Sequence, residues 1–136
     1  MKVSSSAAQA TRYRGIFPGR PEQVARVRHE VRRYLSGAGC PAAVTDDAVL
    51  AVSELSANAI LHSRSRNDFF VVAVEMRSSY IYLQVEDRGG DWELKPRHGE
   101  HHHGLDLIEA FAGLGNWGVD TTAGGRVVWC RLELAR

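Results

Sequence analysis

One stretch of the chain, residues 51–63, carries polar side chains at a spacing suited to binding a ligand. It reads AVSELSANAILHS, so that Glu54, Asn58 and His62 stand four residues apart. In a helix this spacing puts the three side chains on one face. A carboxylate can accept a proton or orient a hydroxyl, and an amide oxygen is a neutral ligand for a hard cation such as Mg²⁺. Taken alone, the solvated stripe of an ordinary amphipathic helix is the commoner explanation of this pattern.

Two further segments combine a ligand-binding residue with glycine. The segment VEDRGGD, residues 85–91, places Asp87 at the end of an expected strand and two glycines just after it. A carboxylate there can accept a hydrogen bond from the exocyclic amine of a base, beside backbone that a ligand can approach closely. In HHHGLDLIEAF, residues 101–111, Gly104 opens an expected helix whose free N–H groups favour phosphate. Each segment alone is weak evidence for a ligand-binding site, since turns and helix starts commonly contain these residues.

Length and composition indicate one globular domain. The chain has 136 residues, of which 44% are hydrophobic and 24% charged, and its formal net charge is +1. With positive and negative charges so nearly balanced, the protein has no overall electrostatic attraction for nucleic acid or an acidic membrane. We therefore expect neither as a direct partner. No apolar run approaches the roughly 20 residues of a membrane span, and the N-terminus lacks a signal peptide's apolar stretch. We therefore expect a cytoplasmic protein whose residues 1–11 form a flexible tail and whose residues 12–136 form one domain.

The periodicity of apolar residues predicts the elements that position these segments. Strands are expected at 12–17, 69–77, 80–87, 117–121 and 127–134, and helices at 21–36, at 104–112 and from Thr45 or Asp46 to His62. Neighbouring strands joined by short turns favour antiparallel pairing. The order predicts an α/β (α+β) two-layer sandwich, with the helices on one face of a mixed, mostly antiparallel sheet.

Together and in this order, the three segments resemble the Bergerat ATP-binding domain of the histidine kinase-like ATPase superfamily. The nearest likeness is to the small anti-sigma-factor serine/threonine kinases, which are stand-alone bacterial regulators. ELSANAILHS at 54–63 looks like their N-box, Asp87 with Gly89 matches their Asp-x-Gly, and HGLDLIEAFA at 103–112 resembles their phosphate-receiving helix. FPGRPEQVARVRHEVRRYL at 17–35 and GGRVVWCRLEL at 124–134 resemble their first segment and last hairpin. The likeness covers roughly residues 12–134.

The resemblance implies ATP and Mg²⁺ as cofactors, and a role for each matching residue. Asp87 would accept the hydrogen bond of the adenine amino group, and Asn58 would hold the Mg²⁺ that bridges the phosphates. Glu54 would act as the general base, or orient the attacking hydroxyl, during phosphoryl transfer. The other residues expected to contact the nucleotide are Gly89, Gly104, Leu105 and His62.

The implied function is phosphorylation of a serine on an anti-sigma-factor antagonist, sequestration of a sigma factor, or both. A homodimer is a further expectation, because relatives of this kind form dimers. Two residues depart from the family pattern: Asp91 replaces the second glycine of Asp-x-Gly-x-Gly, and His102 replaces a glycine ahead of the phosphate helix. They favour an alternative in which the same fold binds nucleotide without catalysis and acts through a partner.

A cluster of histidines leaves a third, less favoured alternative. His98, His101, His102 and His103 lie in one long polar stretch with Glu100. Imidazoles bind Zn²⁺, Ni²⁺ or Cu²⁺, which would suit a metal-responsive protein, and they titrate near neutral pH, which would suit a phosphate contact. No fixed ligand spacing supports a metal site, so a solvated loop is the commoner explanation.

Overall fold

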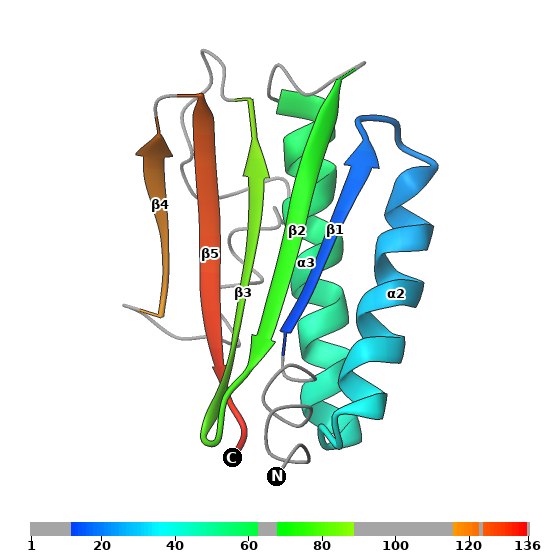
Figure 1. Cartoon of the computed structure of the whole chain (residues 1–136), viewed down its shortest axis with the longest axis vertical. Coiled ribbons are helices and arrows are strands. Elements are labelled where there is room, and N and C mark those ends of the chain that lie inside the picture. Colours follow the sequence, from blue (N-terminus) through cyan, green and yellow to red (C-terminus); the bar gives the residue numbers. More distant parts are fainter. Residues whose placement is uncertain (1–11, 63–67, 89–115, 123, 136) are drawn as a thin grey trace, which may run out of the picture.

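The computed structural model of the chain describes residues 12–62, 68–88, 116–122 and 124–135. Five strands and two helices make up this part (Figure 1). In chain order they are β1 (Arg12–Pro18), α2 (Gln23–Gly37), α3 (Ala42–His62), β2 (Phe69–Met76), β3 (Tyr80–Asp87), β4 (Trp117–Thr122) and β5 (Gly125–Glu133). Every strand expected from the sequence is confirmed, with ends shifted by one or two residues. The helix expected at 104–112 lies outside the described residues.

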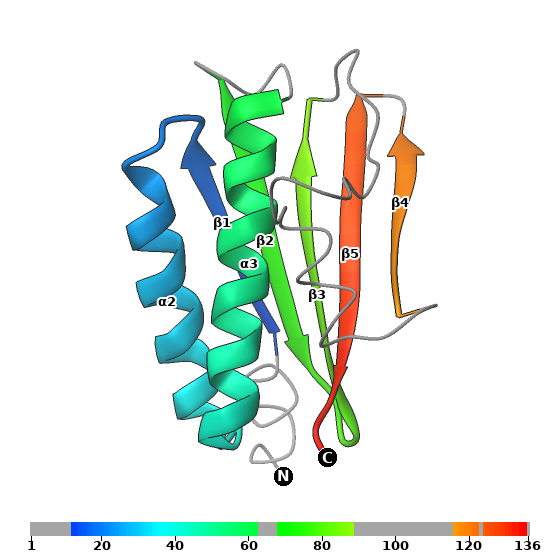
Figure 2. The same ribbon diagram turned by 180° about the vertical axis from the view of Figure 1, so that it is seen from behind.

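The five strands form one sheet in the order β1-β2-β3-β5-β4, and every described pair is antiparallel. Both described helices pack on the same face of this sheet (Figures 1 and 2). The two-layer α+β architecture is therefore confirmed. The mixed character that we expected of the sheet does not occur among the described strands. Figure 2 shows α3 over the middle of the sheet and α2 on its β1 side, while β5 and β4 extend beyond α3.

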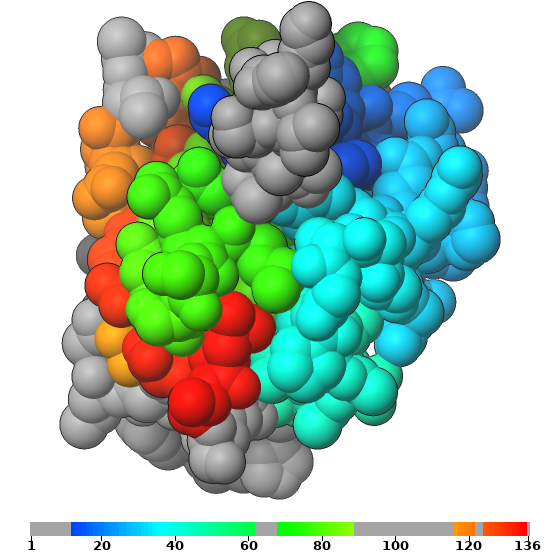
Figure 3. Space-filling view, turned by 60° about the horizontal axis from the view of Figure 1, so that its bottom comes forward, coloured from blue at the N-terminus to red at the C-terminus, as the bar shows by residue number. Residues whose placement is uncertain are grey.

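A tight hairpin joins β2 to β3, as the sequence predicts. The N–H of Arg77 donates a hydrogen bond to the carbonyl of Tyr80 at 2.8 Å, which closes the turn over Ser78 and Ser79. The N–H of Leu134 donates to the carbonyl of Ser79 at 3.0 Å, so the chain that leaves β5 lies against the hairpin. Figure 3 shows these two segments side by side at one end of the molecule.

The start of α3 corrects one expectation. The helix was expected to begin at Thr45 or Asp46, either of which could cap it, but it begins at Ala42, and Thr45 lies in its first turn. The N–H of Thr45 donates to the carbonyl of Pro41 at 2.9 Å, which is the first hydrogen bond of the helix. Its hydroxyl donates to the same carbonyl at 3.0 Å. The helix thus starts directly after Pro41, about one turn before the first residue that was expected to cap it.

The hydrophobic core lies between the helices and the sheet. Inward positions alternate along the strands and recur every three or four residues along the helices, as one-sided burial requires. The largest fully buried side chains are Phe17, Phe70, Leu35, Ile60, Ile81, Leu83, Leu132, Val27, Val31, Val52 and Val72. Cys130 is buried among them, and burial raises the pKa of its thiol to about 12. No described helix has the length and apolar character needed to cross a membrane.

Candidate functional site

One flank of α3 is occupied by its packing against α2. The Nη1 of Arg28 donates to the hydroxyl of Ser53 at 3.2 Å, and the Nη1 of Arg32 donates to Oδ1 of Asp46 at 2.8 Å. Ser53 and Asp46 are seven residues apart, so they lie almost in line along the helix. These two contacts identify the flank of α3 that faces α2.

Glu54 and Asn58 lie away from the flank of α3 that faces α2. Successive helical residues are about 100° apart, so Glu54 is turned a quarter of the circumference or more from Ser53, and Asn58 follows one turn later. Both side chains are half-buried, although Ser53 beside them is buried. Because α2 lies on the β1 side of α3, their flank faces the half of the sheet that contains β3, β5 and β4 (Figure 2). The structure thus brings these two predicted residues together; His62 continues their spacing at the end of α3, but its side chain is not among those described.

Asp87, the last residue of β3, points to the same side of the sheet. It is in phase with the inward residues Ile81, Leu83 and Val85, and only 4% of its surface is exposed. A buried carboxylate is costly unless a cation or hydrogen-bond donors compensate it. The Nη2 of Arg126 lies 3.5 Å from Oδ1 of Asp87 and supplies such a charge. Asp87 and Arg126 are the charged residues among the buried side chains of the described part of the chain.

The end of β3 and the end of α3 lie at the same end of the molecule. β2, which follows α3 in the chain, starts beside the last residues of β3, where Val71 pairs with Glu86. The guanidinium of Arg88 lies 3.6 Å from the carboxylate of Asp68, the residue before β2. Figure 1 shows both ends at the top of the view. Asp87 and the C-terminal turns of α3 are therefore brought to one region, on the helix-covered face.

The other predicted contacts lie outside the described residues. These are Gly89, Gly104 and Leu105, together with Asp91, His102 and the rest of the histidine cluster at 98–103. Within the described part of the chain, no three histidine, cysteine or acidic side chains come close enough to hold a metal ion. The described half of the site is therefore a helix flank with an amide and a carboxylate, and a buried carboxylate at the end of a strand.

Two residues of this region, Gly125 and Arg126, were not recognised from the sequence. Arg126 is directly opposite Asp87 in the pairing of β3 with β5, and it is only 8% exposed. A signal was present, because Arg126 takes the first inward position of a strand whose next inward residues are Val128 and Cys130. A charged residue in such a position requires a buried partner. In the sequence, Gly124 and Gly125 lie between the strands expected at 117–121 and 127–134, where glycine is typical of a turn.

Gly125 allows β5 to approach Asp87. A Cβ atom built on Gly125 would lie 1.9 Å from the carbonyl oxygen of Asp87, a backbone atom that cannot turn aside. We expect Gly125→Ala to push β5 away from the end of β3 and to lower the free energy of unfolding by about 1–3 kcal/mol. Urea unfolding followed by circular dichroism measures this loss. Gly124→Ala is the matched control, because a Cβ there meets nothing within 4 Å; equal stability of the two variants would contradict the close approach.

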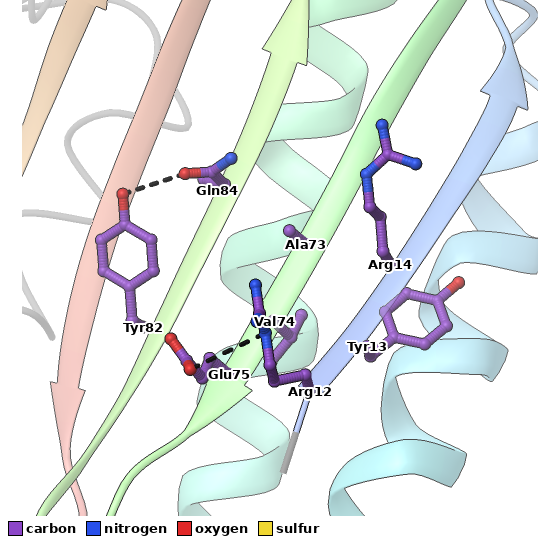
Figure 4. Close-up of a pocket in the computed structure, with 8 residues that line it drawn as sticks. All are labelled: Arg12, Tyr13, Arg14, Ala73, Val74, Glu75, Tyr82 and Gln84. Atoms are coloured by element: carbon purple, nitrogen blue, oxygen red, sulfur yellow. Dashed lines mark hydrogen bonds and ion pairs between the residues drawn. The ribbon is translucent and has the colours of Figure 1, made fainter. Parts of the chain in front are cut away.

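A hollow of about 310 Å³ lies on the other face of the sheet, away from the helices. Figure 4 shows its lining, which consists of Arg12, Tyr13, Arg14, Ala73, Val74, Glu75, Tyr82 and Gln84. Its polar groups satisfy one another in part: the hydroxyl of Tyr82 donates to Gln84 at 3.0 Å, and Arg12 lies 3.8 Å from Glu75. None of the predicted site residues lines it. This surface is thus separate from the region around Asp87.

The described part of the chain combines a two-layer sheet-and-helix fold, a buried aspartate at a strand end and a Glu-x-x-x-Asn helix flank, as the resemblance to the Bergerat domain implies. The family model of the histidine kinase-like ATPase domain matches residues 17–131. The chain therefore belongs to the histidine kinase-like ATPase family.

Comparison with known proteins places the fold in the same class. The chain superimposes with a TM-score of 0.71 on a crystal structure of the RsbU and RsbW domains of Rv1364c from Mycobacterium tuberculosis. The two chains share 22% sequence identity, and the match covers 90% of this chain but 32% of the other. This chain thus spans about a third of the length of that one, and the likeness shows the fold. A search of curated proteins gave no match.

Proposed function

We propose that this protein is an ATP-binding regulator of the anti-sigma-factor kinase type, which phosphorylates a serine on an anti-sigma-factor antagonist and sequesters a sigma factor. The observation that carries the proposal is the buried carboxylate of Asp87, which lies at the end of β3 and on the side of the sheet that Glu54 and Asn58 face. Family membership supports ATP as the ligand. The RsbW domain of the solved neighbour and the sequence motifs support the regulatory class.

The described residues fit ATP and Mg²⁺ chemically. An ionised carboxylate only accepts hydrogen bonds, so Asp87 suits the amino group of adenine and disfavours a base that presents an oxygen there. Asn58 offers a neutral oxygen on a half-buried helix flank, which is the kind of ligand that Mg²⁺ takes alongside phosphate oxygens. Mg²⁺ bound there would neutralise phosphate charge. In this proposal Asp87 selects the base and Asn58 holds the metal.

Glu54 supplies the remaining chemistry in the proposed reaction. It lies one helical turn before Asn58, on the same half-buried flank. Its carboxylate would accept the proton of the attacking serine hydroxyl as that oxygen forms its bond to the γ-phosphorus of ATP, while the bond from this phosphorus to the β,γ-bridging oxygen breaks and ADP leaves. Most of the catalysis in phosphoryl transfer comes from positioning and charge neutralisation, so a single well-placed base on the scaffold is sufficient.

The proposal is tested by phosphoryl transfer. The purified chain is incubated with [γ-³²P]ATP, Mg²⁺ and each anti-sigma-factor antagonist encoded in the genome of its source organism. We expect one antagonist to be labelled on serine, and we expect the label to disappear when Mg²⁺ is chelated. Labelling of histidine, or of no antagonist by a chain that binds ATP, would contradict the kinase assignment.

A second candidate function is supported by Asp91 and His102, which stand where the family usually has glycine. Side chains at these positions restrict the close approach of backbone to phosphates that glycine permits. In this candidate the chain binds ATP as a ligand, transfers no phosphate, and acts by holding its protein partner. ATP binding without labelling of any antagonist would support this function in place of the kinase.

A further inference from the structure

The ion pair between Arg126 and Asp87 is the most buried charge pair in the described part of the chain. Their side chains are 10% and 2% exposed, whereas the other described pairs have at least one partner exposed by a quarter or more. The two residues are direct partners in the β3–β5 ladder. Arg126 begins the inward row of β5 that continues with Val128, Cys130 and Leu132. A position suited to an apolar side chain thus holds a guanidinium.

We infer that Arg126 is a positioning residue that fixes Asp87 as an ionised hydrogen-bond acceptor and thereby sets the base selectivity of the site. The inference rests on the proposed nucleotide-binding function. Arg126 acts through Asp87 and is not itself a contact of the base. Adenine, which presents an amino group, is the base class that such an acceptor selects, and guanine, which presents a carbonyl oxygen at the same ring position, is the one it rejects.

The physical reason is the cost of burying a charge. Without a compensating cation, a carboxylate in an apolar layer takes up a proton and then presents an O–H donor as well as an acceptor. A protonated carboxyl group accepts the hydrogen bond of the adenine amino group less well. It also no longer excludes a base that presents a carbonyl oxygen at that position. At 3.5 Å the guanidinium is an ion-pair partner rather than a short bidentate clamp. A carboxylate has several acceptor sites, so the pairing with Arg126 is compatible with a hydrogen bond from a ligand amine.

Gly125 and Arg126 act on Asp87 from the same strand. Gly125 brings the backbone of β5 against the carbonyl of Asp87, and the next residue directs its guanidinium at the side chain of the same aspartate. The start of β5 therefore determines both where the end of β3 lies and the charge of its last side chain. Arg131 offers a contrast on the same strand, because it lies on the other face, over the ring of Tyr80 at 3.9 Å.

The test compares two nucleotides in each variant. Dissociation constants are measured by titration calorimetry with Mg²⁺ for ATP and for purine riboside triphosphate, which lacks only the amino group. We expect the wild-type protein to prefer ATP by roughly tenfold to a hundredfold, the range for a hydrogen bond to a charged group. Arg126→Met should abolish most of this preference by weakening ATP binding alone, and Arg126→Lys should retain it. Arg131→Met is the matched control and should leave the preference unchanged.

Each outcome decides the inference. An equal loss of affinity for both nucleotides in Arg126→Met would show a purely structural role and overturn it, as would a preference that survives in Arg126→Met. A wild-type protein that binds neither nucleotide would contradict the proposed function itself, and the positioning role would fall with it. Binding of ATP by the wild type with an unaltered preference in Arg126→Met would overturn the inference alone.

A stability measurement covers the case in which Arg126→Met unfolds. If Arg126 compensates the charge of Asp87, the single variant leaves a buried carboxylate without its cation, and adding Asp87→Asn should restore part of the lost stability. We expect the double variant Asp87→Asn/Arg126→Met to unfold at a higher urea concentration than Arg126→Met. A double variant that is less stable than Arg126→Met would overturn the inference.

Discussion

Glu54→Ala is expected to slow phosphoryl transfer by roughly 10²–10⁴-fold, the usual contribution of a general base, while ATP binding changes little. The residue lies on the half-buried flank of α3 that faces away from α2, one turn before Asn58. Loss of its carboxylate removes the group that takes the proton of the attacking hydroxyl. Removing a half-buried polar side chain from this flank leaves the apolar face of the helix intact. The measurement is the single-turnover transfer of ³²P to the labelled antagonist.

Glu54→Gln separates the proposed base from a merely structural side chain. Glutamine keeps the size and much of the hydrogen-bonding capacity of glutamate but cannot accept the proton at neutral pH. The amide variant should therefore be as slow as Glu54→Ala, with an unchanged melting temperature. Transfer at the wild-type rate in either variant would remove Glu54 from the chemistry.

Asn58→Ala is expected to weaken Mg²⁺-dependent ATP binding by at least roughly a hundredfold, because it deletes a metal ligand, whereas loss of a supporting residue around a metal typically costs 10–100-fold. The side chain is half-buried on α3 and is followed by Ala59 and Ile60, which belong to the core. The fold should therefore survive the change. Fluorescence titration with a labelled ATP analogue, in the presence of Mg²⁺ and then of a chelator, measures the effect.

Asp46→Ala is the matched control for Asn58→Ala. Asp46 is a polar residue of the same helix, but it lies on the flank that packs against α2, where it pairs with Arg32 at 2.8 Å. Its loss should cost little, because exposed ion pairs contribute about 0–1 kcal/mol to stability. Asp46→Ala should bind the analogue as the wild type does. If Asn58→Ala also bound it unchanged, Asn58 would not be a ligand of the nucleotide-bound metal.

Most elements of the described fold could be predicted because one-sided burial imposes a period on the sequence. In β3 the inward residues Ile81, Leu83 and Val85 alternate with half-buried ones, and in α2 the inward residues are Val27, Val31 and Leu35. Local capping preferences were a weaker guide. Thr45 is a favourable cap in isolation, but the helix begins at Ala42, and the N–H of Thr45 already donates to the carbonyl of Pro41.

The candidate site could be predicted only where its residues share one local element. Glu54 and Asn58 follow from the spacing within one helix, and Asp87 follows from its place at the end of a strand. The roles of Gly125 and Arg126 depend on the pairing of β3 with β5, which are distant in the chain. No local pattern specifies which residue of β5 lies opposite Asp87. The register had to come from the structure.

Binding of ATP in the region around Asn58 and Asp87 is measured most directly by titration calorimetry. The purified protein is stripped of metals and titrated with ATP and with GTP, each with and without Mg²⁺. We expect one ATP to bind per chain, with a dissociation constant on the order of micromolar, a requirement for Mg²⁺, and clearly weaker binding of GTP. Absence of ATP binding, or equal affinity for ATP and GTP, would contradict this expectation.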